Sequence, residues 1–104
     1  MTIEEFLVEL KSLRRTWSLS PNTLRLEIRT EIDCLCPILA VYRSRHRGRF
    51  WSNRHWRGAA MFLGLSESDA ALIQKAADWN DYEFQDSERT IQCRALRRQL
   101  LELI

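Results

Sequence analysis

Apolar residues recur at steps of three and four positions in most segments of this chain, a spacing that places them on one face of an α-helix. The first such segment is the clearest, and its apolar residues are Ile3, Phe6, Leu7, Leu10 and Leu13. Thr2 and Glu5 stand three residues apart, which is the spacing of a capping box. Acidic residues precede basic ones along the segment, as the helix dipole favours. The pattern predicts a helix that begins near Ile3.

The run from Cys34 to Tyr42 is the most apolar part of the sequence. Pro37 suits the first turn of a helix, and a proline biases the residue before it, here Cys36, away from helical angles. We therefore expect a buried helix from Pro37 to about Arg47, with Gly48 ending it.

A further helix is expected between Ser52 or Asn53, either of which can cap its start, and Gly64, which ends it. Its apolar stripe consists of Trp56, Ala59, Ala60 and Leu63. Small residues in this stripe permit close packing against a neighbouring helix.

Two more helices are predicted in the C-terminal third. Ser66 and Asp69 have the spacing of a helix start, and the helix should reach about Ala77. Asp86 or Ser87 caps the last helix. The residues expected on its buried face are Ile91, Cys93, Leu96, Leu100 and Leu103.

In one segment the apolar residues recur at every second position rather than at every third or fourth. Between residues 24 and 29, apolar and charged side chains alternate, which is typical of a half-buried strand. A turn signal, Ser20-Pro21-Asn22, precedes it, so we expect a short β-hairpin near residues 17–30. The alternative is another helical turn, because leucine, arginine and glutamate all tolerate helix. The predicted fold class is mainly α: a single compact domain of about five helices with this hairpin.

The composition fits one globular domain over residues 1–104, since 45% of the residues are apolar. No apolar run approaches the roughly 20 residues that span a bilayer. The acidic N-terminal segment has neither the basic nor the apolar region of a signal peptide. Three cysteines form an odd set, which argues against a disulfide framework. We expect a cytoplasmic protein with reduced thiols, no cofactor and no membrane attachment.

Positive charge is concentrated in the middle of the chain. Residues 34–66 contain six arginines and no aspartate or glutamate, although the net charge of the whole chain is only +2. Within this stretch, residues 42–58 interleave arginines with aromatic side chains, and such pairs contact phosphates and stack on bases. The candidate interaction residues are Arg43, Arg47, Phe50, Trp51, Arg54, Trp56 and Arg57.

Two interpretations of this basic segment remain open. In one it binds nucleic acid, but the sequence pI of about 8.6 is below the value typical of nucleic-acid-binding domains. In the other its arginines pair with acidic residues elsewhere in the chain or meet a protein partner. The second interpretation predicts that Phe50, Trp51 or Trp56 is partly exposed beside Arg54 or Arg57.

Residues 59–76 have the outline of a helix-turn-helix, with Gly64 between two predicted helices. The motif is weak, because any two helices joined by Gly-Leu-Ser look alike. The second helix would begin with Glu67 and Asp69, and these acids would face phosphates in a complex with DNA. We therefore interpret the segment as a structural helical corner.

Cys36 is the thiol candidate, because a thiol just before a helix N-terminus can have a lowered pKa. This motivates a third hypothesis, a thiol-dependent switch or small enzyme that uses Cys36 or His46. The alternative is that Cys34 and Cys36 are packing residues in the core.

Neither a metal site nor a catalytic set is complete in the sequence. A structural zinc site needs four ligands, and no second paired motif accompanies the Cys-x-Cys. Residues 78–89 suggest a calcium loop, but Glu83 and Arg89 replace its essential glycine and bidentate glutamate. The leading functional prediction is a non-catalytic protein-interaction or regulatory module whose partner is another protein or a second copy of the chain.

Overall fold

The computed structural model describes residues 1–13, 17–19, 25–29, 34–45, 55–78 and 86–103. These residues form five helices: α1 (Ile3–Lys11), α2 (Pro37–Ser44), α3 (Trp56–Leu63), α4 (Glu67–Asp78) and α5 (Ser87–Leu101). They also form three strands: β1 (Trp17–Leu19), β2 (Leu26–Arg29) and β3 (Cys34–Leu35). The prediction of a mainly helical chain with a hairpin is confirmed.

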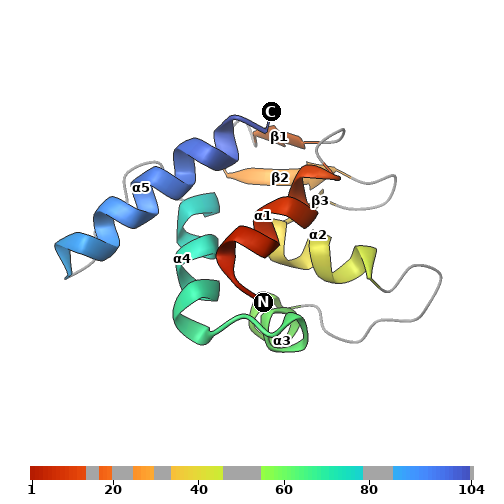
Figure 1. The fold of residues 1–104 in the computed structure, drawn as a ribbon. Helices are drawn as coiled ribbons and strands as arrows, with labels where there is room; N and C mark the ends of the chain where they lie inside the picture. The colour runs from red at the N-terminus through yellow and green to blue at the C-terminus, as the bar shows by residue number, and fades with distance from the viewer. Residues whose placement is uncertain (14–16, 20–24, 30–33, 46–54, 79–85, 104) are drawn as a thin grey trace.

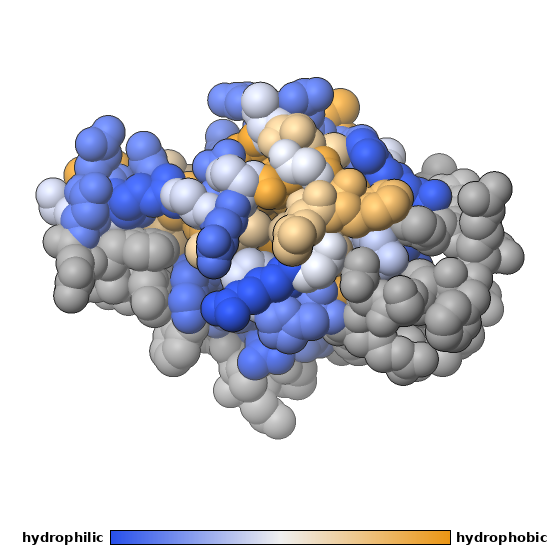
Figure 2. All heavy atoms as spheres, turned by 90° about the horizontal axis from the view of Figure 1, so that it is seen from below, coloured by the Kyte–Doolittle hydropathy of each residue, from blue (hydrophilic) through white to orange (hydrophobic). Residues whose placement is uncertain are grey.

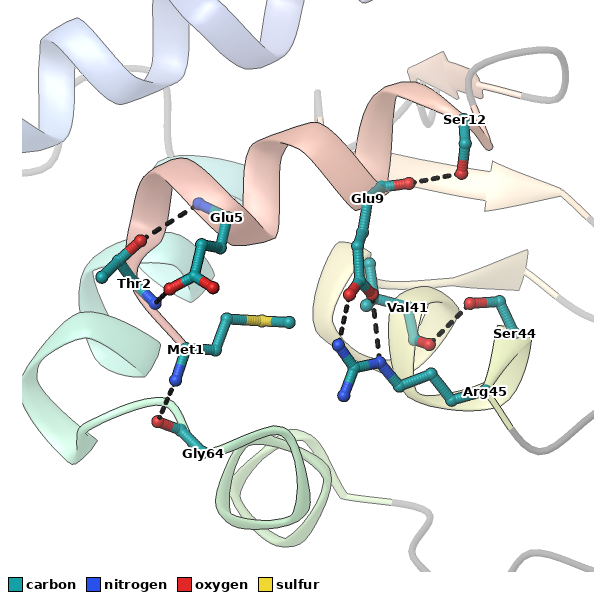
Figure 3. A network of polar contacts seen from close by, with 9 residues as sticks. All are labelled: Met1, Thr2, Glu5, Glu9, Ser12, Val41, Ser44, Arg45 and Gly64. Carbon is teal, nitrogen blue, oxygen red and sulfur yellow. Dashed lines mark hydrogen bonds and ion pairs between the residues drawn. The ribbon is translucent and has the colours of Figure 1, made fainter.

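The capping residues read from the sequence define several helix starts. At α1, the Thr2 hydroxyl accepts from the Glu5 backbone at 3.1 Å, and the Thr2 backbone donates to the Glu5 carboxylate at 3.0 Å (Figure 3). Ser66 accepts from the Asp69 backbone at 3.0 Å, and Asp86 caps α5. These local pairs satisfy N–H groups that a helix leaves without intrahelical partners.

Two helix limits differ from the prediction. Helix α2 ends at Ser44, before Arg47, and the Ser44 hydroxyl donates to the Val41 carbonyl at 2.7 Å. The cap of α3 is His55, whose Nδ1 accepts from the Arg57 backbone at 3.2 Å. A neutral imidazole nitrogen accepts a hydrogen bond as a side-chain oxygen does. The predicted caps Ser52 and Asn53, like Gly48, lie outside the described residues.

The strands form one antiparallel sheet in the order β1-β2-β3. Strands β1 and β2 make the predicted hairpin, with Trp17 opposite Ile28. Strand β3 was not predicted, since two residues carry no readable period. Leu26 and Ile28 are buried on one face of β2, while Glu27 between them is half-buried.

Helix α2 lies at the centre and packs against α1, α3, α4, β2 and β3. Helix α5 packs along α4. In Figure 1 the sheet and α3 lie at opposite ends of the molecule, with α2 between them. Fully buried side chains from four helices and the sheet meet in one core that includes Phe6, Leu10, Leu26, Ile38, Ile73 and Leu100.

The buried stripe of α5 differs from the predicted one. Cys93, Leu96 and Leu100 are buried as expected, and so is Leu103 beyond the helix. Ile91, however, is 64% exposed, so its predicted burial is wrong. The inward face carries Arg97 instead, which is only 4% exposed. Helix α5 packs mainly on α4, and the direction of that contact selects the buried stripe.

A candidate interaction surface on helix α3

Helix α3 is short, and only part of its circumference is covered. Ala59, Ala60 and Leu63 are buried in the core, as the sequence predicted for this stripe. On the opposite side, Met61 is 81% exposed and Phe62 is 52% exposed. Adjacent apolar side chains exposed to solvent make this part of α3 a candidate contact surface.

The N-terminal end of α3 carries an ordered aromatic and cationic group. The Arg57 guanidinium lies over the half-buried Trp56 ring, with its central carbon 5.3 Å from the ring centroid. The His55 ring stacks on Trp56 at a centroid distance of 5.6 Å and an interplanar angle of 28°. Cation–π attraction and stacking therefore hold Arg57 and Trp56 in a defined arrangement.

The Phe62 ring packs against a buried ring of α2. Its ring contacts the buried Tyr42 ring of α2 edge to face, with centroids 5.2 Å apart and an interplanar angle of 83°. Such edge-to-face pairs fix ring orientation, and they add to the stability that burial alone gives. Phe62 thus presents a fixed apolar surface to solvent.

A hollow of about 200 Å³ lies between α3 and α4. It is lined by Trp56, Arg57, Ala60, Met61, Leu65, Glu67 and Ala70. Most of these side chains are apolar, and the two alanines leave the space that larger residues would fill. One cation, Arg57, and one anion, Glu67, stand at its edge.

We call the surface formed by Trp56, Arg57, Met61, Phe62 and Glu67, together with the hollow, the α3 face. Viewed from the end of the molecule that carries α3, apolar side chains gather in the middle of the surface and border strongly hydrophilic ones (Figure 2). An apolar centre with a charged margin is the usual composition of a protein interface.

The structure brings together two of the predicted interaction residues. Trp56 is partly exposed beside Arg57, as the protein-interaction hypothesis requires. Arg43 lies half-buried on α2. The other four predicted residues, Arg47, Phe50, Trp51 and Arg54, lie outside the described part of the chain.

Arg45 shows where one arginine of the basic segment goes. Its Nε donates to Oε2 of Glu9 at 3.1 Å, and its Nη2 contacts the other oxygen of the same carboxylate (Figure 3). Hydrogen bonding to Glu9 raises the pKa of Arg45. The basic segment therefore folds back on the acidic N-terminal helix at this position.

Met61, Phe62 and Glu67 were missed as candidate site residues. A signal was available, because Met61 and Phe62 fall outside the predicted stripe of Trp56, Ala59, Ala60 and Leu63. Only packing could decide that no other described element covers them. Scattered exposed apolar residues are common, so the sequence alone gave them little weight.

The thiol candidate, Cys36, lies in an environment that opposes ionisation. Cys36 is the N-cap residue of α2, but its side chain makes no capping hydrogen bond. Burial raises the pKa of the Cys36 thiol to about 11, which opposes formation of the reactive thiolate. His46 lies outside the described residues. At Cys36 the cost of desolvation therefore outweighs the effect of the helix N-terminus, which favours the alternative of a packing residue in the core.

The helical corner is as expected. Gly64 joins α3 to α4 with a left-handed φ of 77°, and α4 begins with Glu67 and Asp69. Over the described ranges, no group of three or more His, Cys, Asp or Glu side chains could hold a metal ion. None of the five helices is long and apolar enough to cross a membrane, in the part of the chain that the structure describes.

No family model matches the chain, and neither a curated protein nor a solved structure matches it. Functional inference therefore depends on the chemistry of the α3 face.

Proposed function

We propose that this chain is a non-catalytic protein-interaction module that binds its partner through the α3 face. The observation that carries the proposal is the exposure of Met61 and Phe62 next to the ordered Trp56–Arg57 pair. Tryptophan, arginine, methionine and phenylalanine are enriched at the centres of protein interfaces. Trp56, Arg57 and Met61 line the same hollow, and Phe62 follows Met61 on the same short helix.

The α3 face is also preorganised for binding. The Trp56 ring contacts both the His55 ring and the Arg57 guanidinium, and the Phe62 ring contacts Tyr42 edge to face. Ordering a side chain on association costs about 0.5–1.5 kcal/mol, and side chains ordered beforehand avoid most of that cost. Met61 is 81% exposed, and its flexible thioether can adapt to an irregular partner surface.

Nucleic-acid binding through residues 42–58 is the weaker alternative. Arg57 beside Trp56 could meet a phosphate and a base. Against this, Arg45 is already paired with Glu9, and Glu67 stands at the edge of the same hollow as Arg57. The apolar side chains of Met61 and Phe62 cannot neutralise phosphate charges, whereas they can pack against an apolar protein surface.

A thiol switch or small enzyme receives less support still. A thiol with a pKa of about 11 is almost entirely protonated at neutral pH, so Cys36 is a poor nucleophile. We expect the module to act in the cytoplasm, where its cysteines remain thiols.

A photo-crosslinking experiment in cells tests the proposal. The full chain carries a photoreactive amino acid in place of Met61 or, as a matched control, in place of Ile91, another exposed apolar residue on α5. We expect a discrete protein adduct from position 61 and none of the same size from position 91. Excess chain without the photoreactive group should compete the adduct away, whereas excess chain with Trp56→Ala and Phe62→Ala should not.

The same experiment has two outcomes that overturn the proposal. One is that position 61 gives no adduct that the unsubstituted chain can compete. The other is that the competed adduct is nucleic acid rather than protein, which would favour the alternative.

A further inference from the structure

We infer that the occupant of the α3 face is a second copy of this chain, bound about a two-fold axis. The inference rests on the proposed function, since it assigns the partner of the same surface. Three properties of the α3 face support it: a protruding side chain next to a hollow, opposite charges at the edge of that hollow, and further apolar area on the same helix.

The first property is the position of the exposed Met61 side chain beside the hollow. Met61 projects into solvent and also lines the hollow of about 200 Å³ between α3 and α4. In a two-fold interface, each surface element of one copy meets the complementary element of the other. Met61 of each copy can therefore enter the hollow of its partner, and both insertions form together. The flexible, polarizable methionine side chain suits such a cavity.

The second property is the charge at the edge of the hollow. Arg57 stands in the first turn of α3, and Glu67 begins α4, just beyond the end of α3. A uniformly acidic partner would be repelled by Glu67, and a uniformly basic one by Arg57. A second copy turned by two-fold symmetry can present Glu67 to Arg57 and Arg57 to Glu67. The charge pattern thus favours a copy over a partner of a single charge sign.

The third property is the apolar area that Phe62 and Trp56 add to that of Met61. Phe62 and the exposed part of Trp56 lie on the same short helix as Met61, and both rings are held by aromatic neighbours. A standard interface takes about 800 Å² from each partner, and the accessible surface of this chain is 6848 Å². The α3 face was defined by five side chains, whereas a standard interface uses about 20–30 residues on each side. We therefore expect a reversible dimer with a dissociation constant on the order of tens of micromolar.

Sedimentation velocity on the purified full chain tests the inference. Between about 5 and 500 μM, a range that brackets the expected dissociation constant, the weight-average mass should rise from monomer toward dimer. Met61→Glu should raise the dissociation constant by about tenfold or more, because it places a charge in an apolar hollow. Ile91→Glu makes the same kind of change at an exposed site on α5 and should leave the dissociation constant unchanged.

Charge exchange tests the two-fold arrangement itself. Arg57→Glu and Glu67→Arg should each weaken the dimer by about tenfold, since two symmetric pairs become repulsive at once. An equimolar mixture of these two variants should form a heterodimer as tight as the wild-type dimer, because every pair is attractive again. Arg98→Glu on α5 changes the net charge as Arg57→Glu does and should have no effect. Circular dichroism of each variant verifies that it is folded.

The outcomes separate this inference from the proposed function. A chain that stays monomeric at the highest concentration overturns the self-association, while a competed protein adduct from position 61 would still support an interaction module with another partner. The inference is also overturned if Met61→Glu leaves the dissociation constant of the dimer unchanged. It is overturned as well if the mixture of charge variants does not restore association. A dimer that is restored by the mixture establishes the second copy as the occupant.

Discussion

Arg97 is a charged residue on the inward side of a helix. Its Nη1 donates to the carbonyls of Ala76 at 3.0 Å and Ala77 at 2.7 Å, in the last turn of α4. These carbonyls lie at the negative end of the α4 dipole and have no intrahelical N–H partner. Burial lowers the pKa of Arg97, but an arginine stays charged even so. Arg97 therefore serves as the C-terminal cap of α4 and joins it to α5.

Replacing Arg97 should be costly for that reason. Arg97→Ala removes two charge-assisted hydrogen bonds and leaves buried carbonyls without their donor, so we expect a loss of about 2–3 kcal/mol in unfolding free energy. Arg98→Ala alters an exposed arginine on the same helix and should change stability by less than about 0.5 kcal/mol. Urea titration of both variants measures the difference. Equal stability of the two variants would contradict the capping role of Arg97.

Ile91 and Arg97 together show the limit of residue-by-residue reasoning. The apolar pattern of α5 predicted that Ile91 is buried and did not predict burial of Arg97, because isoleucine is apolar and arginine is charged. The structure exposes Ile91 and buries Arg97. When Cys93, Leu96 and Leu100 point inward, the 3.6-residue period of the helix places Arg97 on the same face. The same period places Ile91 on the opposite face.

At the scale of the element, α3 depends on its glycine terminator. Gly64 has a φ of 77°, and its backbone N–H caps the last turn of the helix. Its own carbonyl accepts from the Met1 amino group at 3.0 Å (Figure 3). The turn at Gly64 directs the chain from α3 into α4 and so forms the wall of the hollow in the α3 face.

Substitutions at Gly64 should separate backbone strain from crowding. A Cβ atom there would lie 3.2 Å from the Met1 nitrogen, for alanine and asparagine alike. Gly64→Ala should cost about 1–2 kcal/mol, because alanine disfavours the left-handed region. Gly64→Asn should cost less than half as much, since asparagine adopts that region more readily. Chemical denaturation compares them, and equal losses would mean that crowding at Met1 dominates over the backbone conformation.

At the scale of the whole molecule, the basic middle of the chain is partly neutralised from within. The ion pair between Arg45 and Glu9 joins α2 to α1. Outside the basic middle, Nε of Arg25 lies 3.4 Å from Oδ1 of Asp78 in α4. These contacts are partly exposed, so each contributes little to stability. Their importance is electrostatic, because arginines held by carboxylates offer less charge to an external polyanion.

This internal pairing predicts weak binding to nucleic acid. In fluorescence anisotropy, mixed-sequence DNA and RNA should show no saturable binding to the chain at physiological salt. Weak binding at low salt should vanish on salt addition and should change little with Met61→Glu. Saturable binding at physiological salt that Arg57→Ala abolishes would instead support the nucleic-acid hypothesis for residues 42–58.

The helical class and the caps of α1, α4 and α5 could be predicted from the amino-acid sequence, and the hairpin was the favoured of two interpretations. Capping and period depend on residues within about four positions of one another, so a local pattern such as Thr2 with Glu5 contains all the necessary information. Trp56 with Arg57 could be predicted for the same reason, since they are adjacent in the chain.

Three features could not be predicted from the sequence: the short strand β3, the inward position of Arg97 and the exposure of Met61 and Phe62. Each of these features depends on where a neighbouring helix or strand lies. The packing of the whole core sets that position, and no local sequence period encodes it. The hollow beside Met61 arises in the same way, because it exists only where α3 and α4 meet.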